Sequence, residues 1–137
     1  PTGPQGPSGS GGNTTTVKIS LSSAQLQSIT PTTPFTLVAA QSGKAAVPIS
    51  AFYDYKFGTA QYSSLVTFGL KLSNTGIINL GNCNISPNYS LLGKVNFNFS
   101  AGNVGADSID SSIVLFSTVT PLVGDGTVDI YLTYAQL

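Results

Sequence analysis

The segment Lys44-Ala-Ala-Val-Pro-Ile-Ser-Ala-Phe-Tyr-Asp-Tyr-Lys-Phe57 decides the fold class of this chain. Its apolar and polar residues alternate with the period of two that is typical of a β-strand with one buried face. Pro48 lacks an N–H donor, so we expect this strand to lie at a sheet edge or to bend there. The expected apolar face carries Ala45, Val47, Ile49, Ala51, Tyr53, Tyr55 and Phe57, and the opposite face carries Ser50, Asp54 and Lys56.

Similar short apolar patterns recur on both sides of this segment. The continuous run Ile113–Phe116 is typical of a strand that is buried on both faces. Turn residues separate the strands, and helix-forming patterns are almost absent. The chain is therefore expected to be all-β, an antiparallel β-sandwich or jelly roll. The other expected strands or short apolar runs are Val17–Leu21, Phe35–Val38, Val66–Leu72, Ile77–Leu80, Val95–Phe99 and Thr127–Tyr134.

One short helix is expected early in the chain. Ser22 and Gln25 have the spacing of a capping box, which begins a helix at the next residue. Pro31 cannot continue a helix, so its length is limited to about Ser23–Ser28. We expect this helix to cover one end of the β structure, with Leu26 facing inward.

Residues 1–12 have glycine at every third position, Gly3, Gly6, Gly9 and Gly12, and proline opens the first three triplets. This period is typical of a collagen triple helix, in which only glycine fits at the crowded axis of three chains. The alternative is a flexible Pro/Gly linker. Four triplets are too few to hold three chains together, so we expect either a longer repeat before Pro1 or a trimer made by residues 13–137, the head domain.

The charge content also favours a trimer. Only 7% of the residues are charged, compared with roughly 25% in typical domains. A soluble monomer usually needs more surface charge, so we interpret the uncharged surface as buried between subunits of a homotrimer. The net charge of zero gives no electrostatic attraction for nucleic acid or an anionic membrane, and neither is expected as a partner.

The residue types that are missing argue against an enzyme. The sequence contains no Arg, Glu, His, Trp or Met, which removes the commonest general acids, bases and metal ligands. Asp107 and Asp110 could form a weak calcium site, but a polar loop is the favoured interpretation, and Asp125 between two glycines is expected to be a turn residue. No catalytic residue, cofactor or metal is expected. No apolar run approaches the roughly 18 residues of a membrane-spanning helix.

The single cysteine, Cys83, cannot form an intrachain disulfide, which favours assembly in a reducing cytosol. Two tyrosines in expected loops, Tyr62 and Tyr89, are candidate receptor contacts because aromatic residues are common anchors of binding surfaces. Asn88, beside Tyr89, could add a hydrogen bond to such a contact. The alternative for both tyrosines is an ordinary aromatic residue buried under a loop.

Three stretches carry a resemblance to a known class of proteins. They are Pro34-Phe-Thr-Leu-Val-Ala-Ala-Gln-Ser-Gly-Lys-Ala-Ala-Val-Pro-Ile49, Tyr55-Lys-Phe-Gly-Thr-Ala-Gln-Tyr62 and Pro121-Leu-Val-Gly-Asp-Gly-Thr-Val-Asp-Ile-Tyr-Leu-Thr-Tyr134. They resemble the C-terminal β domains of tailed-bacteriophage virion proteins, including fibre, spike and decoration proteins, which a collagen-like stretch often precedes. The resemblance implies a trimeric structural appendage that is assembled in the host cytoplasm, contacts other virion proteins and is displayed on the particle surface.

These observations lead to three hypotheses of function. The first is a non-enzymatic trimeric head of a phage fibre or spike that attaches the virion to a bacterial surface glycan or protein. The second is a purely structural trimerisation or capsid-decoration domain. The third is a head like those of the C1q and tumour-necrosis-factor class on a collagen-like spore-surface protein, which shares the order of collagen followed by β jelly roll. A glycan-processing spike is disfavoured, because such enzymes need paired carboxylates.

Overall fold

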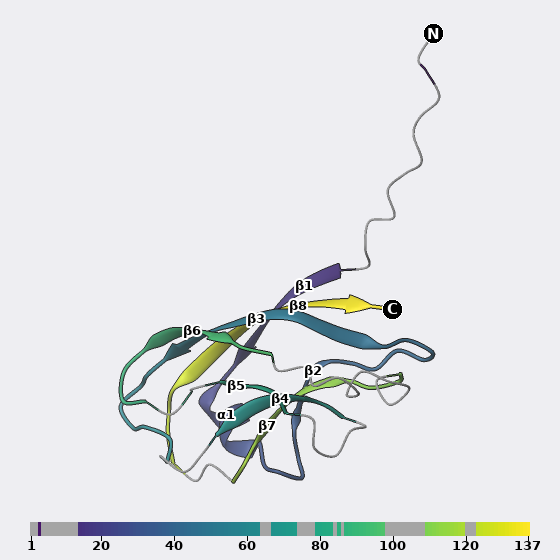
Figure 1. Cartoon of the computed structure of the whole chain (residues 1–137). Helices are drawn as coiled ribbons and strands as arrows, with labels where there is room; N and C mark the ends of the chain where they lie inside the picture. Colours follow the sequence, from purple (N-terminus) through teal and green to yellow (C-terminus); the bar gives the residue numbers. More distant parts are fainter. Residues whose placement is uncertain are drawn as a thin grey trace.

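The computed structural model describes Gly3 and residues 14–63, 67–73, 79–83, 85, 87–97, 109–119 and 123–137. These residues form two four-stranded antiparallel sheets that pack face to face (Figure 1). The all-β sandwich expected from the sequence is therefore confirmed for the described part of the chain. The first sheet has the order β1 (Thr14–Leu21), β8 (Thr127–Gln136), β3 (Ala46–Lys56) and β6 (Leu91–Val95). The second has the order β2 (Phe35–Val38), β7 (Ile113–Ser117), β4 (Phe68–Leu72) and β5 (Asn79–Cys83).

Every connection between consecutive strands passes from one sheet to the other, except the connection from β4 to β5. This strand order matches that of an eight-stranded jelly roll. It gives the sandwich two ends. We call the end with Thr14 and Gln136 the proximal end, because the chain enters β1 there and the paired β8 finishes there. The opposite end, with Leu21 and Thr127, is the distal end, roughly 23 Å away along β1 at about 3.3 Å per residue.

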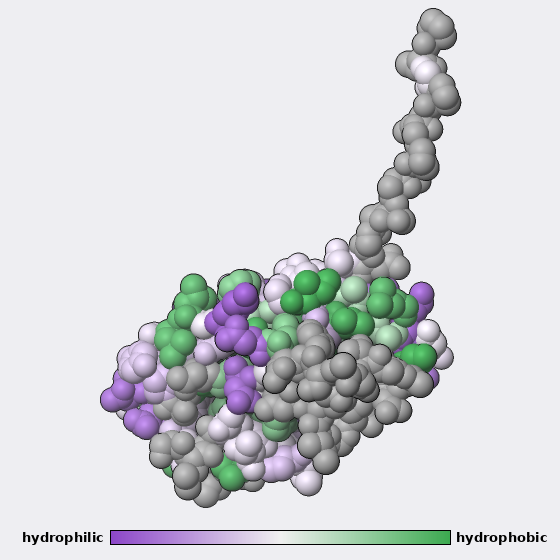
Figure 2. Space-filling model, viewed as in Figure 1, coloured by the Kyte–Doolittle hydropathy of each residue, from purple (hydrophilic) through white to green (hydrophobic). Residues whose placement is uncertain are grey.

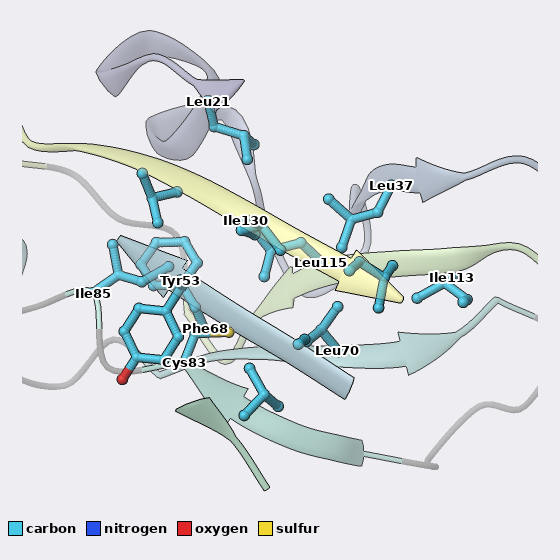
Figure 3. Packing of buried hydrophobic residues seen from close by; sticks show 14 of the residues in the cluster. Leu21, Leu37, Tyr53, Phe68, Leu70, Cys83, Ile85, Ile113, Leu115 and Ile130 are labelled. Atoms are coloured by element: carbon cyan, nitrogen blue, oxygen red, sulfur yellow. The ribbon is translucent and has the colours of Figure 1, made fainter. Parts of the chain in front are cut away.

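The hydrophobic core lies between the two sheets. In Figure 3 the side chain of Ile130, from the first sheet, points toward Leu70 and Leu115 of the second. Tyr53 and Tyr55 of β3 are also buried there, as their place on the apolar face predicted. Burying such side chains is the main favourable contribution to folding, at roughly 1.5–3 kcal/mol for each large apolar residue.

The helix α1 (Ser23–Ser28) begins and ends where the sequence predicted. The Gln25 side-chain oxygen Oε1 accepts a hydrogen bond from the Ser22 N–H at 2.9 Å, and Ser22 Oγ accepts from the Gln25 N–H at 3.3 Å. Leu26 is fully buried in the core. The helix therefore closes the distal end between β1 and β2, as expected.

One prediction about β3 is wrong in its first half. Pro48 pairs with Tyr134 and Ser50 pairs with Thr133, so Ile49 is an extra residue with no partner opposite it. Such a β-bulge exchanges the two faces of the strand. As a result Pro48 is buried, whereas Ile49, expected on the inner face, is 50% exposed. Of the two expectations for Pro48, a sheet edge or a bend, the structure shows a register shift next to Pro48, where β6 does not yet pair with β3 because that pairing covers only Ala51 to Tyr55.

The expected strand Val95–Phe99 is also misplaced. The strand in this region is β6, which begins at Leu91 and ends at Val95, where it pairs with Ala51. Asn96 and Phe97 lie outside the strand, beside the bulged part of β3, where the regular pairing of β3 with β6 does not continue. Residues 98–99 lie outside the described residues. The short apolar run expected at residues 77–80 belongs in part to β5, which runs from residue 79 to residue 83.

The collagen-like stalk and the homotrimer stay predictions. Gly3 is exposed, and a Cβ placed on it would meet no atom within 4 Å. Gly6, Gly9 and Gly12 lie outside the described residues. Within the described residues, no helix is long and apolar enough to cross a membrane.

Candidate binding site at the distal end

Asp125 holds two of the connections at the distal end together. Its carboxylate accepts hydrogen bonds from the Thr59 N–H at 2.7 Å, the Thr59 hydroxyl at 2.6 Å and the Ala60 N–H at 2.8 Å. These bonds, led by the one from the Thr59 hydroxyl, lower the pKa of Asp125 below its ordinary value. Gly58 is needed beside it, because a Cβ there would lie 2.2 Å from Asp125 Oδ1. The expected turn residue is thus also a cross-link between the β3–β4 and β7–β8 connections.

Tyr62 is buried and does not form part of the surface. Its hydroxyl donates to the Gly126 carbonyl oxygen at 2.8 Å, and its ring meets Phe68 edge to face at a centroid distance of 6.0 Å. Gly124, with a φ of +129°, lies against the same ring, where a Cβ would come within 2.4 Å of Tyr62 Cδ1. Burial raises the pKa of Tyr62. Of the two interpretations left open by the sequence, the structure selects the buried loop aromatic for Tyr62.

Further hydrogen bonds connect the remaining segments of this end. Gln27 Nε2 of α1 donates to the Gly124 carbonyl. Ser90 Oγ accepts from the Phe57 N–H at 2.9 Å, and the Ser117 hydroxyl donates to the Ile29 carbonyl at 2.9 Å. All four connections at the distal end are therefore held to a neighbour by a side chain.

Tyr89 and Asn88 lie on this end, in the connection between β5 and β6, and both are exposed. The Tyr89 side chain is 59% exposed, and two valines of the β7–β8 connection, Val119 and Val123, are exposed at the same end. The next residue, Ser90, is fixed by its bond to Phe57. An aromatic ring and an amide beside an anchored residue can offer stacking and hydrogen bonds to a ligand.

The remaining candidates for chemistry are the acidic residues and the single cysteine. They contain no group of three or more His, Cys, Asp or Glu that could hold a metal ion. Asp110, at a φ of +59°, accepts a hydrogen bond from the Gly43 N–H at 2.6 Å. Asp107, its partner in the calcium site weighed above, lies outside the described residues. Cys83 is buried in the hydrophobic core, and this burial raises the pKa of its thiol to about 12.

Comparisons with known proteins give one distant similarity. No family model matches the chain, and no curated protein matches it. Among solved structures, the chain is similar to one from the cyanophage Pam1 capsid asymmetric unit, with a TM-score of 0.49 and 13% sequence identity. The match covers 94% of this chain and 89% of that one. Similarity at this level assigns the chain to no family, so its function has to be argued from its own residues.

Proposed function

We propose that this chain is a non-enzymatic structural protein of a phage virion: the trimeric head of a fibre or spike that attaches the particle to a glycan or protein on a bacterial surface. The observation that carries this proposal is the separation of the two ends of the jelly roll. The chain enters β1 at Thr14 on the proximal end, beside Ala135 near the C-terminus. The exposed Tyr89 lies on the opposite end. A stalk before Thr14 would therefore present Tyr89 outward.

The hydrogen bonds at the distal end support a binding role. Asp125, Tyr62 and Ser90 fix the connections that surround the exposed residues. A loop that is already ordered loses less conformational entropy when it binds. Three copies on one axis would then add avidity to a weak contact at each Tyr89.

The low charge supports the trimer. The chain has only ten charged residues among 137, and a surface with so little charge is unusual for a protein that stays monomeric. The glycine period of residues 1–12 leads to the same oligomer independently. Mass measurement in solution tests this part, and a monomer at micromolar concentration would contradict it.

Binding to host cells tests the role of the distal end. The Tyr89→Ala and Asn88→Ala variants of the whole chain are compared with Leu137→Ala, the loss of an exposed large side chain at the proximal end. We expect Tyr89→Ala to lower binding to host cells or to a glycan array about tenfold or more, which is the effect of a typical anchor residue. Equal binding by all three variants and the unchanged protein would reject attachment through this end.

A purely structural role is the second candidate, and the same hydrogen bonds favour it. The bonds of Asp125 and Gln27 join the distal segments to one another, as a domain that only holds a trimer or decorates a capsid would require. A spore-surface head of the C1q and tumour-necrosis-factor class would share this arrangement. A stable trimer that binds neither cells nor glycans would support the structural role over attachment.

A further inference from the structure

The outer face of the first sheet carries a row of four side chains that crosses all four strands. Lys18 of β1 is opposite Tyr131 of β8, Tyr131 is opposite Phe52 of β3, and Phe52 is opposite Lys94 of β6. Phe52 is 44% exposed and Tyr131 is 38% exposed. Side chains directly opposite each other on neighbouring strands have Cβ atoms about 5 Å apart. The two side chains therefore form one apolar platform, in which Lys18 Nζ lies over the Tyr131 ring at 5.6 Å from its centroid and Lys94 lies opposite Phe52.

The charges on this face distinguish it from the rest of the surface. It carries five of the ten charged residues of the chain: Lys18, Lys56, Lys94, Asp54 and Asp129. Lys18 pairs with Asp129 at 2.9 Å and Lys56 pairs with Asp54 at 2.8 Å. Lys94 is exposed and makes no ion pair with any described residue. Charged residues are depleted at the centres of protein interfaces, so this face is expected to stay in solvent when copies of the chain associate.

A groove of about 290 Å³ lies beside the platform. It forms because β6 ends at Val95 while β3 continues through its bulge, which turns Ile49 outward. Lys94 belongs both to the groove and to the row. Figure 2 shows hydrophobic and hydrophilic residues side by side along the upper rim of the molecule, where Figure 1 places this sheet. The groove is lined by Ile49, Ser50, Lys94, Val95, Asn96 and Phe97.

We propose that this face binds an acidic polysaccharide. A sugar ring has an apolar face of C–H groups, which packs well against the negative face of an aromatic ring such as Phe52. Its hydroxyl groups need polar partners, and Ser50 and Asn96 supply them at the edge of the groove. Lys94 provides a positive charge for a carboxylate of the sugar. The site is on the side of the sandwich and is independent of attachment through Tyr89.

Calorimetric titration of the whole chain tests the proposal. The probes are a hexamer of galacturonic acid and, as the uncharged comparison, a hexamer of galactose, both at low salt. We expect saturable binding of the acidic hexamer that is at least tenfold tighter than binding of the neutral one. Phe52→Ala should weaken binding tenfold or more, because it removes half of the platform.

The lysine is tested by a matched pair. Lys94→Gln should weaken binding of the acidic hexamer about three- to tenfold and leave the neutral hexamer unchanged. Lys44→Gln removes the same charge from an exposed lysine at the proximal end and should change neither. Tyr89→Ala should also leave this binding unchanged, which separates the side face from the distal end.

Three results would overturn the proposal. The first is no saturable binding of the acidic hexamer. The second is equal weakening by Lys94→Gln and Lys44→Gln, which would mean that only total charge matters. The third is a Phe52→Ala protein that remains folded by circular dichroism but loses its oligomeric mass, because the face would then be an interface between copies.

Discussion

The two ends of the jelly roll are fastened in different ways. Among the described residues of the proximal end, the Ala45 N–H donates to the Leu137 carbonyl at 2.9 Å, the Leu137 N–H donates back at 3.0 Å, and Ala45 forms a bridge with Ile109. Two side chains, those of Asp110 and Ser73, also accept backbone hydrogen bonds there. At the distal end the side chains of Asp125 and Tyr62 make the connections. Backbone bonds survive most substitutions, whereas side-chain bonds require one residue type. The contacts of Asp125 and Tyr62 are therefore expected to be more sensitive to mutation than the backbone bonds between Ala45 and Leu137.

The largest expected difference between the two ends is in the loss of stability when a glycine with positive φ is replaced by alanine. Gly124→Ala at the distal end would force a non-glycine residue to a φ of +129° and place its Cβ 2.4 Å from the Tyr62 ring. Strain and overpacking together should lower the free energy of unfolding by about 3–5 kcal/mol. Gly43→Ala at the proximal end has a φ of +70° and open space around its Cβ, so about 1–2 kcal/mol is expected.

Urea unfolding followed by circular dichroism measures both variants. Equal losses of stability would mean that the backbone conformation alone matters and that the packing of Tyr62 on Gly124 contributes nothing.

Asp125→Asn should have the next largest effect, a fall of several degrees in Tm at pH 7. The carboxylate of Asp125 now accepts hydrogen bonds from the N–H groups of Thr59 and Ala60. The NH₂ group of asparagine is a donor and cannot accept these bonds. Because the folded protein lowers the pKa of Asp125, the carboxylate stabilises the fold above its ordinary pKa of 3.8. This contribution is lost as the pH falls through the lowered value. The difference in Tm between Asp125→Asn and the unchanged protein should therefore become smaller below about pH 4.

Asp110→Asn is the matched change at the proximal end. Asparagine tolerates the φ of +59° at this position, and its side-chain oxygen can still accept from the Gly43 N–H. We expect a smaller fall in Tm than for Asp125→Asn. A larger loss than that of Asp125→Asn would reverse the contrast between the two ends.

Two tyrosine hydroxyls should have smaller and opposite effects. Tyr62→Phe removes the bond to the Gly126 carbonyl and should cost about 1 kcal/mol. The Tyr55 hydroxyl is buried without a hydrogen-bond partner among the described residues, and burial raises its pKa. Tyr55→Phe should therefore be neutral or stabilise the fold by up to about 1 kcal/mol. Urea midpoints compare the two variants, and a marked loss for Tyr55→Phe would reveal a partner for its hydroxyl.

The smallest expected difference between variants is in the rate at which the distal end opens. The rate at which a thiol reagent labels Cys83 measures this opening. Cys83 pairs with Phe68 where β5 and β4 meet that end. With its pKa raised to about 12, roughly one thiol in ten thousand is ionised at pH 8, and the thiolate is the reactive form. A thiol reagent should label the folded protein slowly, and faster in Gly124→Ala than in Gly43→Ala. Identical rates in the folded protein and in urea would contradict a buried thiol.

Local patterns were enough to predict most of the fold. The helix was placed correctly because Ser22 and Gln25 act on neighbouring backbone groups, and Tyr53 was placed in the core by alternation alone. β6 was missed because Leu91-Leu92-Gly93-Lys94-Val95 does not alternate: Leu92 is 73% exposed, and Gly93 leaves room for the Tyr53 ring. The residue that makes this glycine necessary is 40 positions away in the sequence.

The candidate site was harder to predict than the fold. Tyr62 and Tyr89 both lie in predicted loops and both precede a serine, so the sequence offers the same local signal for each. Their difference depends on Gly126, 64 positions from Tyr62, which accepts the hydroxyl of one tyrosine but not of the other. The bonds of Asp125 were missed for the same reason, since Thr59 lies 66 positions before it. Contacts across such distances leave no periodic pattern in the sequence.

The bulge at Ile49 divides β3 into two parts whose inward-facing positions are offset by one residue. Its residues before the bulge face inward at even numbers, and those after it face inward at odd numbers. Deleting Ile49 would give β3 a single alternation of inward-facing and outward-facing side chains along its whole length. It would also shift the first half of the strand by one residue and remove one wall of the groove beside Lys94. The presence of this one residue therefore decides whether the side of the sheet is continuous or has a groove.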